Sequence, residues 1–218
     1  MPRHARAPFL ILSATLALST SAHTQPPTTP TGIFQSSTDI GATRPGATLY
    51  NPATNSYRIT GGGADLWGAA DQFHLTWLKL SGDATLSADI HFAPNTSDPT
   101  AKAILIFRQS LSPDSAYADA AIHNDGHITL QYRATPAGKT EDSTAPEHNI
   151  THLRIKRKGD QFTLYVGSDT EPATPAATVV LHDPIYVGIG VCAHNADHLE
   201  TATFSNVKLD RPSPHPTQ

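Results

Sequence analysis

Apolar and polar residues alternate along most of the chain. In residues 85–92, TLSADIHF, and residues 126–133, GHITLQYR, every second side chain is apolar. Successive side chains of a β-strand point to opposite faces, so this pattern predicts strands that bury one face and expose the other. Further short β-branched or aromatic runs occupy residues 101–109, 152–159, 161–167, 176–182, 185–194 and 200–209.

The breaks between these runs have the composition of turns. Asn-Pro stands at 51–52, Ser-Gly-Asp at 81–83, Asn-Asp-Gly at 124–126 and Lys-Gly-Asp at 158–160. Such residues favour tight turns, and we find no helical period of ordinary length. Many short strands separated by turns predict an all-β sandwich or barrel, in which two sheets pack their apolar faces together.

The two ends of the chain differ from this central part. Residues 1–22 have a basic start, an apolar run and small residues before a cleavage point, so we predict a signal peptide and an exported protein, periplasmic or extracellular. An uncleaved anchor is the alternative; after cleavage we expect no membrane insertion. We predict a Pro/Thr-rich linker over 23–31, a single β-sandwich domain over 32–210 and a disordered tail over 211–218.

Cysteine content and charge narrow the classes of partner. Cys192 is the single cysteine and lies in an apolar run, so we expect it to be buried and inert. The formal net charge is -4 and the pI is near 6.3, which argues against nucleic acid or an anionic membrane as a partner. The basic run LRIKRKGD, on a strand, is expected to form a solvated rim.

Two segments of similar pattern contain paired histidines. Residues 123–127 read HNDGH and residues 194–198 read HNADH. Paired histidines are zinc-ligand types, but hairpin turns explain Asn, Asp and Gly without a metal. We therefore predict no metal and no cofactor, although Asp-rich turns such as NTSD (95–98) would permit Ca²⁺.

Seven segments in order carry a resemblance to a known family. They are DIG (39–41), GGGADLWGAADQFH (61–74), LSGDATLSADI (80–90), AKAILIFRQSL (101–111), ITLQYR (128–133), LRIKRKGDQFTLY (153–165) and YVGIGVCAHNADHLETATFSNVKL (186–209). Together they resemble a bacterial, secreted or periplasmic β-sandwich module of the concanavalin A-like lectin/glucanase superfamily, found alone or with glycan hydrolases and Tol-type propeller proteins.

This resemblance implies an antiparallel jelly roll of two curved sheets, one of them concave. It does not imply a particular activity, because proteins that share a fold can differ in function. Two departures concern aromatic residues that relatives would use. EHNITH (147–152) has no aromatic stretch, and TEPATPAATVV (170–180) lacks the expected Trp.

The stretch GGGADLWG (61–68) places a tryptophan directly after three glycines, and this tryptophan could either pack into the fold or face a ligand. Glycine permits positive φ and close backbone approach, which suits a corner. Asp65 can bond back to nearby amides, and Leu66 or Trp67 can seal the sandwich edge. We expect Trp67 to be buried or half-buried rather than an exposed platform, and Trp77 to be part of the core. Asp65 and Trp67 form a candidate edge site.

The main candidate site lies on the concave face. Residues 116–123 place alternate polar side chains beside those of residues 126–133 across the Asn-Asp-Gly hairpin. The candidate ligand-binding residues are Arg108, Tyr117, Asp119, His123, Gln131 and Arg133. We expect Asp to accept, Arg to donate, Gln to do both and Tyr to stack on a sugar ring. The alternative is that this is simply the solvated face of an antiparallel sheet.

Catalytic motifs are missing from the sequence. Glucanases of the superfamily carry Glu-x-Asp-x-x-Glu on one strand, and that spacing is missing here, as are a Gly-x-Ser-x-Gly elbow and a His-Glu-x-x-His helix. No catalytic residue is therefore assigned. We predict a non-catalytic, exported module that binds carbohydrate or another envelope component. The alternatives are a protein-interaction module of the envelope, working beside a Tol-type propeller, and a glycoside hydrolase with an atypical acid pair.

Overall fold

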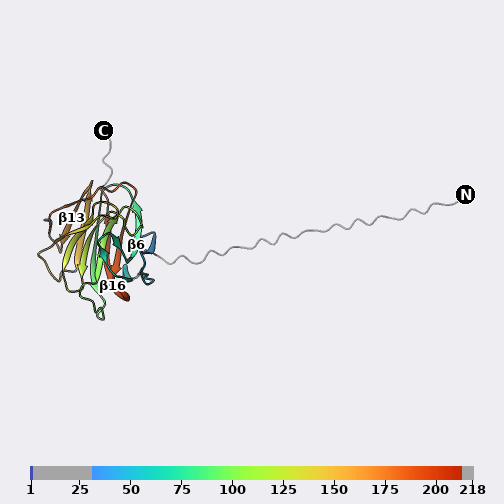
Figure 1. Ribbon diagram of the computed structural model, residues 1–218, viewed down its shortest axis with the longest axis horizontal. Helices are drawn as coiled ribbons and strands as arrows, with labels where there is room; N and C mark the ends of the chain where they lie inside the picture. Colours follow the sequence, from blue (N-terminus) through green and yellow to red (C-terminus); the bar gives the residue numbers. More distant parts are fainter. Residues whose placement is uncertain (2–30, 213–218) are drawn as a thin grey trace, which may run out of the picture.

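The computed structural model describes Met1 and residues 31–212 (Figure 1). The predictions for residues 2–30 and 213–218, which include nearly all of the signal peptide, linker and tail, lie outside the described residues. The described strands are β1 (Ser36–Ile40), β2 (Ala47–Asn51), β3 (Ser56–Gly63), β4 (Leu66–Trp67), β5 (Ala70–Asp71), β6 (Phe73–Leu80), β7 (Ala84–Phe92), β8 (Lys102–Arg108), β9 (Tyr117–His123), β10 (Ile128–Arg133), β11 (Thr140–Thr144), β12 (His152–Lys158), β13 (Gln161–Val166), β14 (Ala177–Thr178), β15 (Ile185–Cys192) and β16 (Asn195–Asp210).

Two seven-stranded sheets form the body of the protein. The first has the order β1-β6-β15-β8-β9-β10-β11, and the second has the order β14-β13-β12-β7-β16-β3-β2. Neighbouring strands pair antiparallel throughout, and β4 and β5 form a separate two-stranded ribbon. This is the predicted jelly-roll β-sandwich. None of the described residues belongs to a helix long and apolar enough to cross a membrane.

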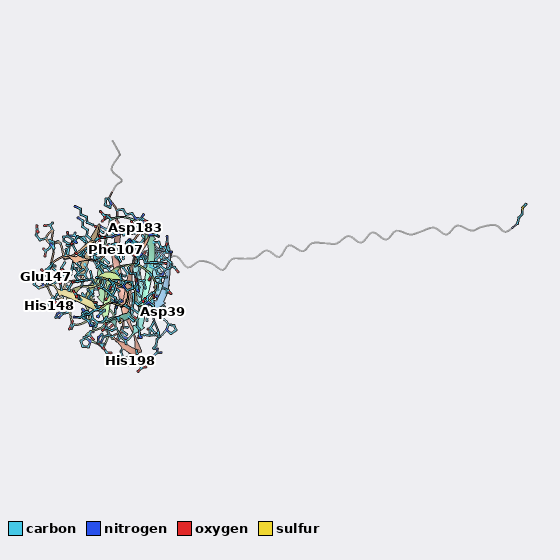
Figure 2. All side chains as sticks on the ribbon, turned by 45° about the horizontal axis from the view of Figure 1, so that its top comes forward. Asp39, Phe107, Glu147, His148, Asp183 and His198 are labelled. Carbon is cyan, nitrogen blue, oxygen red and sulfur yellow. The ribbon has the colours of Figure 1, made fainter. Side chains whose placement is uncertain are left out.

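The main core lies between the two sheets, as the alternating pattern predicts. Phe107 of β8, which is labelled in Figure 2, belongs to this core. Its ring packs on Phe162 of β13, with ring centroids 5.6 Å apart. Alternate residues of β9, Ala118 and Ala120, belong to the same core. Large apolar areas removed from water on both inner faces supply most of the stabilisation of such a fold.

A second apolar cluster covers part of the outer face of the first sheet. Its buried members are Ile40, Leu66, Phe73, Leu75, Ile104, Ile106, Tyr117, Ala121 and Cys192. Trp77 packs at the margin of this cluster and is partly buried, so it belongs to this outer cluster rather than to the core between the sheets. Cys192 is buried as expected, and burial raises the pKa of its thiol to about 12.

The glycine triplet makes the corner that leads into the second cluster. Gly63 has φ of +110°, and a Cβ there would lie 1.9 Å from the backbone oxygen of Gln72. A Cβ on Gly61 would lie 2.1 Å from the backbone oxygen of Val191. Both the positive φ and the close approach require glycine, as the sequence indicates.

Candidate functional site

The six predicted site residues do share one face. Arg108, Tyr117, Asp119, His123, Gln131 and Arg133 alternate with core residues on β8, β9 and β10. In the register, Asp119 lies opposite Gln131, and Tyr117 lies opposite both Arg108 and Arg133. All six therefore project from the outer face of the first sheet, called here the pocket face.

A short segment, Asp65–Asp71, folds over one end of the pocket face, and we call it the cap. It contains the ribbon of β4 and β5, in which Leu66 pairs with Asp71 and Trp67 with Ala70. Leu66 is fully buried in the second apolar cluster. Asp65 bonds to the adjacent backbone, its Oδ1 accepting from the Leu66 N–H at 2.7 Å, as expected for this residue.

The cap is anchored by a buried ion-pair network. Arg133 donates to both carboxylate oxygens of Asp71, at 2.6 Å and 3.0 Å, and Arg108 contacts the same carboxylate at 3.5 Å. Arg133 also donates to the carbonyl oxygens of Trp67 and Gly68, at 3.2 Å and 3.1 Å. Burial lowers the pKa of Arg108 to about 10, so its guanidinium remains a cation at neutral pH.

Four of the predicted ligand-binding residues are buried and not available to a ligand. Arg108, Tyr117, Asp119 and Arg133 are all 0% exposed beneath or beside the cap. The Tyr117 ring lies under the guanidinium of Arg133, at 4.9 Å from its centroid, and is not free to stack on a sugar. The expectation that these four side chains meet a ligand does not fit this arrangement, because another segment of the same chain covers them.

Asp119 is buried without a hydrogen-bond partner. Neither carboxyl oxygen bonds to any of the described residues. Burial raises its pKa well above the ordinary value, because a charged carboxylate loses its hydration there. Burial therefore favours the protonated, uncharged form of Asp119 over its charged form.

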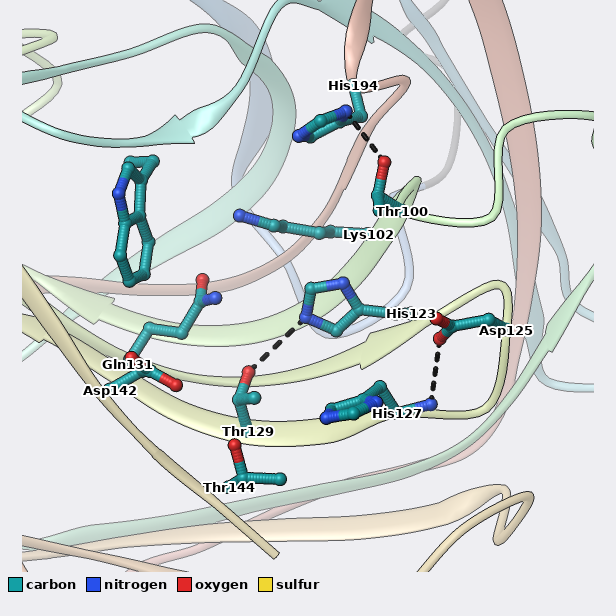
Figure 3. Close-up of a pocket in the computed structure, with 11 residues that line it drawn as sticks. Thr100, Lys102, His123, Asp125, His127, Thr129, Gln131, Asp142, Thr144 and His194 are labelled. Carbon is teal, nitrogen blue, oxygen red and sulfur yellow. Dashed lines mark hydrogen bonds between the residues drawn. The ribbon is translucent and has the colours of Figure 1, made fainter.

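Beside the cap, the pocket face opens into a hollow of about 340 Å³ (Figure 3). Its lining residues are Trp67, Thr100, Lys102, His123, Asp125, His127, Thr129, Gln131, Asp142, Thr144 and His194. Of the predicted residues, His123, Gln131 and Trp67 are in this set. The side chains of Lys102, His123, Gln131 and His194 converge on the hollow from β8, β9, β10 and the turn between β15 and β16.

The tryptophan of the cap forms one wall of the pocket. Trp67 is 37% exposed, which corrects the expectation that it is withdrawn from solvent. Its neighbour Leu66 is the residue that seals the fold. The ammonium of Lys102 lies 5.4 Å from the Trp67 ring centroid and donates to Asp65 Oδ1 at 2.7 Å. Trp67 and Asp65, predicted together as an edge site, thus belong to the rim of the same pocket.

The opposite wall comes from the two histidine-containing turns. His123 Nε2 lies 3.5 Å from the hydroxyl of Thr129, and His194 Nδ1 lies 2.7 Å from that of Thr100. The His127 ring packs edge-on against His148 at 4.9 Å. Among the described residues no group of three His, Cys, Asp or Glu side chains is arranged to hold a metal ion. Residues of both histidine-containing turns thus line the pocket.

Several residues that line the pocket were not predicted from the sequence. Asp142 and Thr144 come from β11, a polar edge strand that has no apolar alternation to reveal it. Lys102 and Thr100 precede or begin β8, within a run that reads as core. The sequence feature that could have indicated them is the charge of Lys102 within an otherwise apolar run.

The pKa of His123 leads to a prediction about pH. Burial, followed by the positive charge of Lys102, lowers it from 6.5 to about 4. Between these values the unfolded chain binds a proton that the folded protein does not, so stability falls as pH drops from 6.5 to 4. The free energy of unfolding of His123→Gln should therefore decrease by about 2 kcal/mol less than that of the wild-type protein over this pH range. Urea unfolding across this pH range measures it, with the exposed His198→Gln as control; equal slopes for all three proteins would refute the assignment.

Comparisons with known proteins agree on the fold and not on a family. No protein-family model matches the chain, and no curated protein matches it. A functionally unknown protein from Saccharomyces cerevisiae is similar in structure, with a TM-score of 0.59 and 19% identity over 82% of this chain and 97% of that chain. Carbohydrate-binding module CBM66 from Bacillus subtilis has a TM-score of 0.51 and 15% identity, over 82% of this chain and 98% of that chain.

A third similar structure is the family 7 alginate lyase A1-II′, in complex with its product. Its TM-score is 0.51 at 11% identity, over 75% of this chain and 82% of that chain. At these identities the likeness shows the fold alone. The protein has a jelly-roll β-sandwich fold, and its structural neighbours include carbohydrate-binding and glycan-active proteins.

Proposed function

We propose that the protein is an exported, non-catalytic module that binds carbohydrate in the pocket beside the cap. The observation that supports this most is the composition of the pocket: one exposed indole wall, with the other lining side chains polar or charged. A pyranose ring has an apolar face and a rim of hydroxyls. It would place the first against Trp67 and the second against the polar wall.

The polar wall offers both kinds of hydrogen-bonding group. Thr129, Thr144 and the histidine rings can donate or accept, while Asp142 can accept. Sugar hydroxyls also do both, so they match this mixture without requiring a charged partner. The likeness in fold to a carbohydrate-binding module supports the same proposal.

A binding role is favoured over hydrolysis by the position of the acids. The two lining carboxylates, Asp125 and Asp142, are both exposed. A glycosidase normally needs one acid whose pKa is raised by an enclosed, apolar environment. The two fully buried acids, Asp71 and Asp119, have no exposed atoms through which to reach a substrate, and the buried Glu200 does not line the pocket.

Replacing the indole tests the proposal. Trp67→Ala should weaken binding to an immobilised or soluble oligosaccharide at least about tenfold, because the stacking surface is lost. Trp67→Phe should retain most of the affinity. Calorimetry on hits from a glycan array gives the numbers, with Tyr165→Ala as control, since Tyr165 lies in β13 of the second sheet.

Three results would overturn the proposal. An array without any hit, together with capture of an envelope protein by the same pocket face, would favour the scaffold alternative. Affinity unchanged by Trp67→Ala would place binding elsewhere. Release of reducing sugar, abolished by Asp142→Asn, would show an enzyme.

A further inference from the structure

The cations of the pocket face are all paired within the protein. Lys102 is the one Lys or Arg among the described lining residues, and its ammonium bonds to Asp65 at 2.7 Å. Arg108 and Arg133 are completely buried and share the carboxylate of Asp71. An acidic ligand would therefore find no unpaired Lys or Arg in this pocket. Breaking one of these pairs to bind it would leave a buried charge without its partner.

The carboxylates that line the pocket have no comparable partner. Asp125 and Asp142 form no ion pair with any described residue. Asp125 Oδ1 accepts only the backbone N–H of His127, at 3.0 Å, within its own turn. Their negative charges thus act on whatever occupies the hollow, and they repel an anion and leave a neutral molecule unaffected.

An acceptor at the base of the pocket also requires a donor. Gln131 is only 2% exposed, and its Oε1 is buried without a hydrogen-bond partner among the described residues. Figure 3 shows its amide directed into the same hollow as Lys102 and His123. A buried acceptor left unbonded is unfavourable, so a ligand that supplies a hydroxyl there gains affinity. The carboxylate of an acidic sugar has no hydrogen to supply, but its ring hydroxyls do, so this acceptor favours hydroxyl-bearing ligands and leaves the exclusion of anions to Asp125 and Asp142.

We infer that this pocket selects neutral, hydroxyl-bearing sugars and rejects acidic ones such as uronates. The inference rests on the proposed carbohydrate function and specifies its ligand class. Exclusion comes from two unpaired carboxylates, and selection comes from the unbonded amide oxygen of Gln131. The three cations of the face stabilise the fold and the cap and take no part in recognition.

A glycan array that contains neutral and acidic oligosaccharides gives the first test. Hits among neutral glycans are expected, with acidic ones absent or weak. Hits confined to acidic glycans would overturn this inference while leaving the proposed function standing. An array with no hit at all would overturn both.

Matched sugars then isolate the charge. β-1,4-linked oligomers of mannose, mannuronate and methyl mannuronate, and the corresponding glucose series, differ only at C6. In whichever series binds, we expect the uronate to bind at least about tenfold more weakly than the neutral sugar. The methyl ester should recover most of the difference, and added salt should reduce it. A uronate that binds as tightly as its ester would contradict the inference.

The final variant removes the charges and keeps the shape. Asp125→Asn with Asp142→Asn retains the acceptor oxygens, including the one used by His127. It should reduce the neutral-to-uronate ratio to under about threefold. Glu141→Gln is the matched control. Glu141 is the next residue along β11, but its carboxylate bonds to Tyr132 OH at 2.8 Å and does not line the pocket. A ratio that Glu141→Gln changes as much as the double variant would overturn the inference.

Discussion

Asp71→Asn is expected to destabilise the protein by about 3 to 5 kcal/mol. Asp71 is completely buried, and its carboxylate is shared by two guanidinium groups that are also completely buried. An amide of the same size keeps one acceptor oxygen but removes the negative charge, so Arg108 and Arg133 would remain as two uncompensated cations. Urea unfolding at pH 7 measures the change, and thermal unfolding should show a parallel decrease.

Asp183→Asn is the control for the Asp71 variant. Asp183 also pairs with an arginine, at 2.7 Å from Arg157, but its side chain is 40% exposed. Arg157 additionally donates to the carbonyl oxygen of Leu181. This substitution should cost clearly less than Asp71→Asn, because Asp183 is partly solvated and the buried Arg157 keeps its hydrogen bonds to the carbonyl oxygens of Gly82, Gly159 and Leu181. A loss for Asp71→Asn as small as that would show that the network does not anchor the cap.

A cycle of substitutions separates the ion pair from general damage. If Asp71 and Arg133 act mainly through each other, Asp71→Asn combined with Arg133→Met should cost less than the two single losses added together. The same variants should also change the pocket, because Trp67 is held by a cap that Arg133 fixes through the Trp67 and Gly68 carbonyls. Stability and ligand affinity should therefore decline together in this series.

The fold could be predicted from the sequence because it is a local property of short segments. Residues 85–92 and 126–133 alternate apolar and polar side chains, and β7 and β10 lie within one or two residues of those boundaries. Each such run needs another apolar face to cover it, so two facing sheets follow directly. Where this pattern is weak, as in Ala47–Asn51 and Thr140–Thr144, strands were missed, because they are sheet-edge strands with little or no apolar alternation.

The site was predicted less completely, for a different physical reason. Alternation along β9 and β10 places Asp119 and Arg133 on the correct face, but it cannot show whether that face meets water. Accessibility depends on the cap, which comes from a part of the chain 48 or more residues earlier than Asp119. No local pattern reports that residues 65–71 turn back over the sheet, and so buried anchors were taken for ligand-binding groups.

The same covering explains the unusual composition of the pocket face. A polar row of two arginines, a tyrosine and an aspartate would be the solvated face of an ordinary antiparallel sheet. Here Asp71 enters from the cap, neutralises the arginines and allows Leu66 to bury itself beside them. The cap thus converts a solvated face into a second core and leaves the pocket at its open end.

Asp119 lies within that second core without a partner, and its removal should increase stability. Asp119→Asn is expected to stabilise the folded protein at pH 7, because the amide has no charged form to bury. The raised pKa means that the folded protein holds a proton which the unfolded chain releases above about pH 4. Stability therefore decreases as pH rises from there, and the variant, which does not ionise, avoids that decrease.

The pH dependence distinguishes this cause from improved packing. The gain for Asp119→Asn should be largest near neutral pH and should disappear below about pH 4, where both states of the wild-type protein carry the proton. A gain that is the same at pH 4 and pH 7 would contradict a raised pKa of Asp119, and so would a loss at pH 7. Asp160→Asn, at an exposed turn position, is the control and should have little effect at either pH. Ligand binding should persist in Asp119→Asn, since Asp119 is not among the residues that line the pocket.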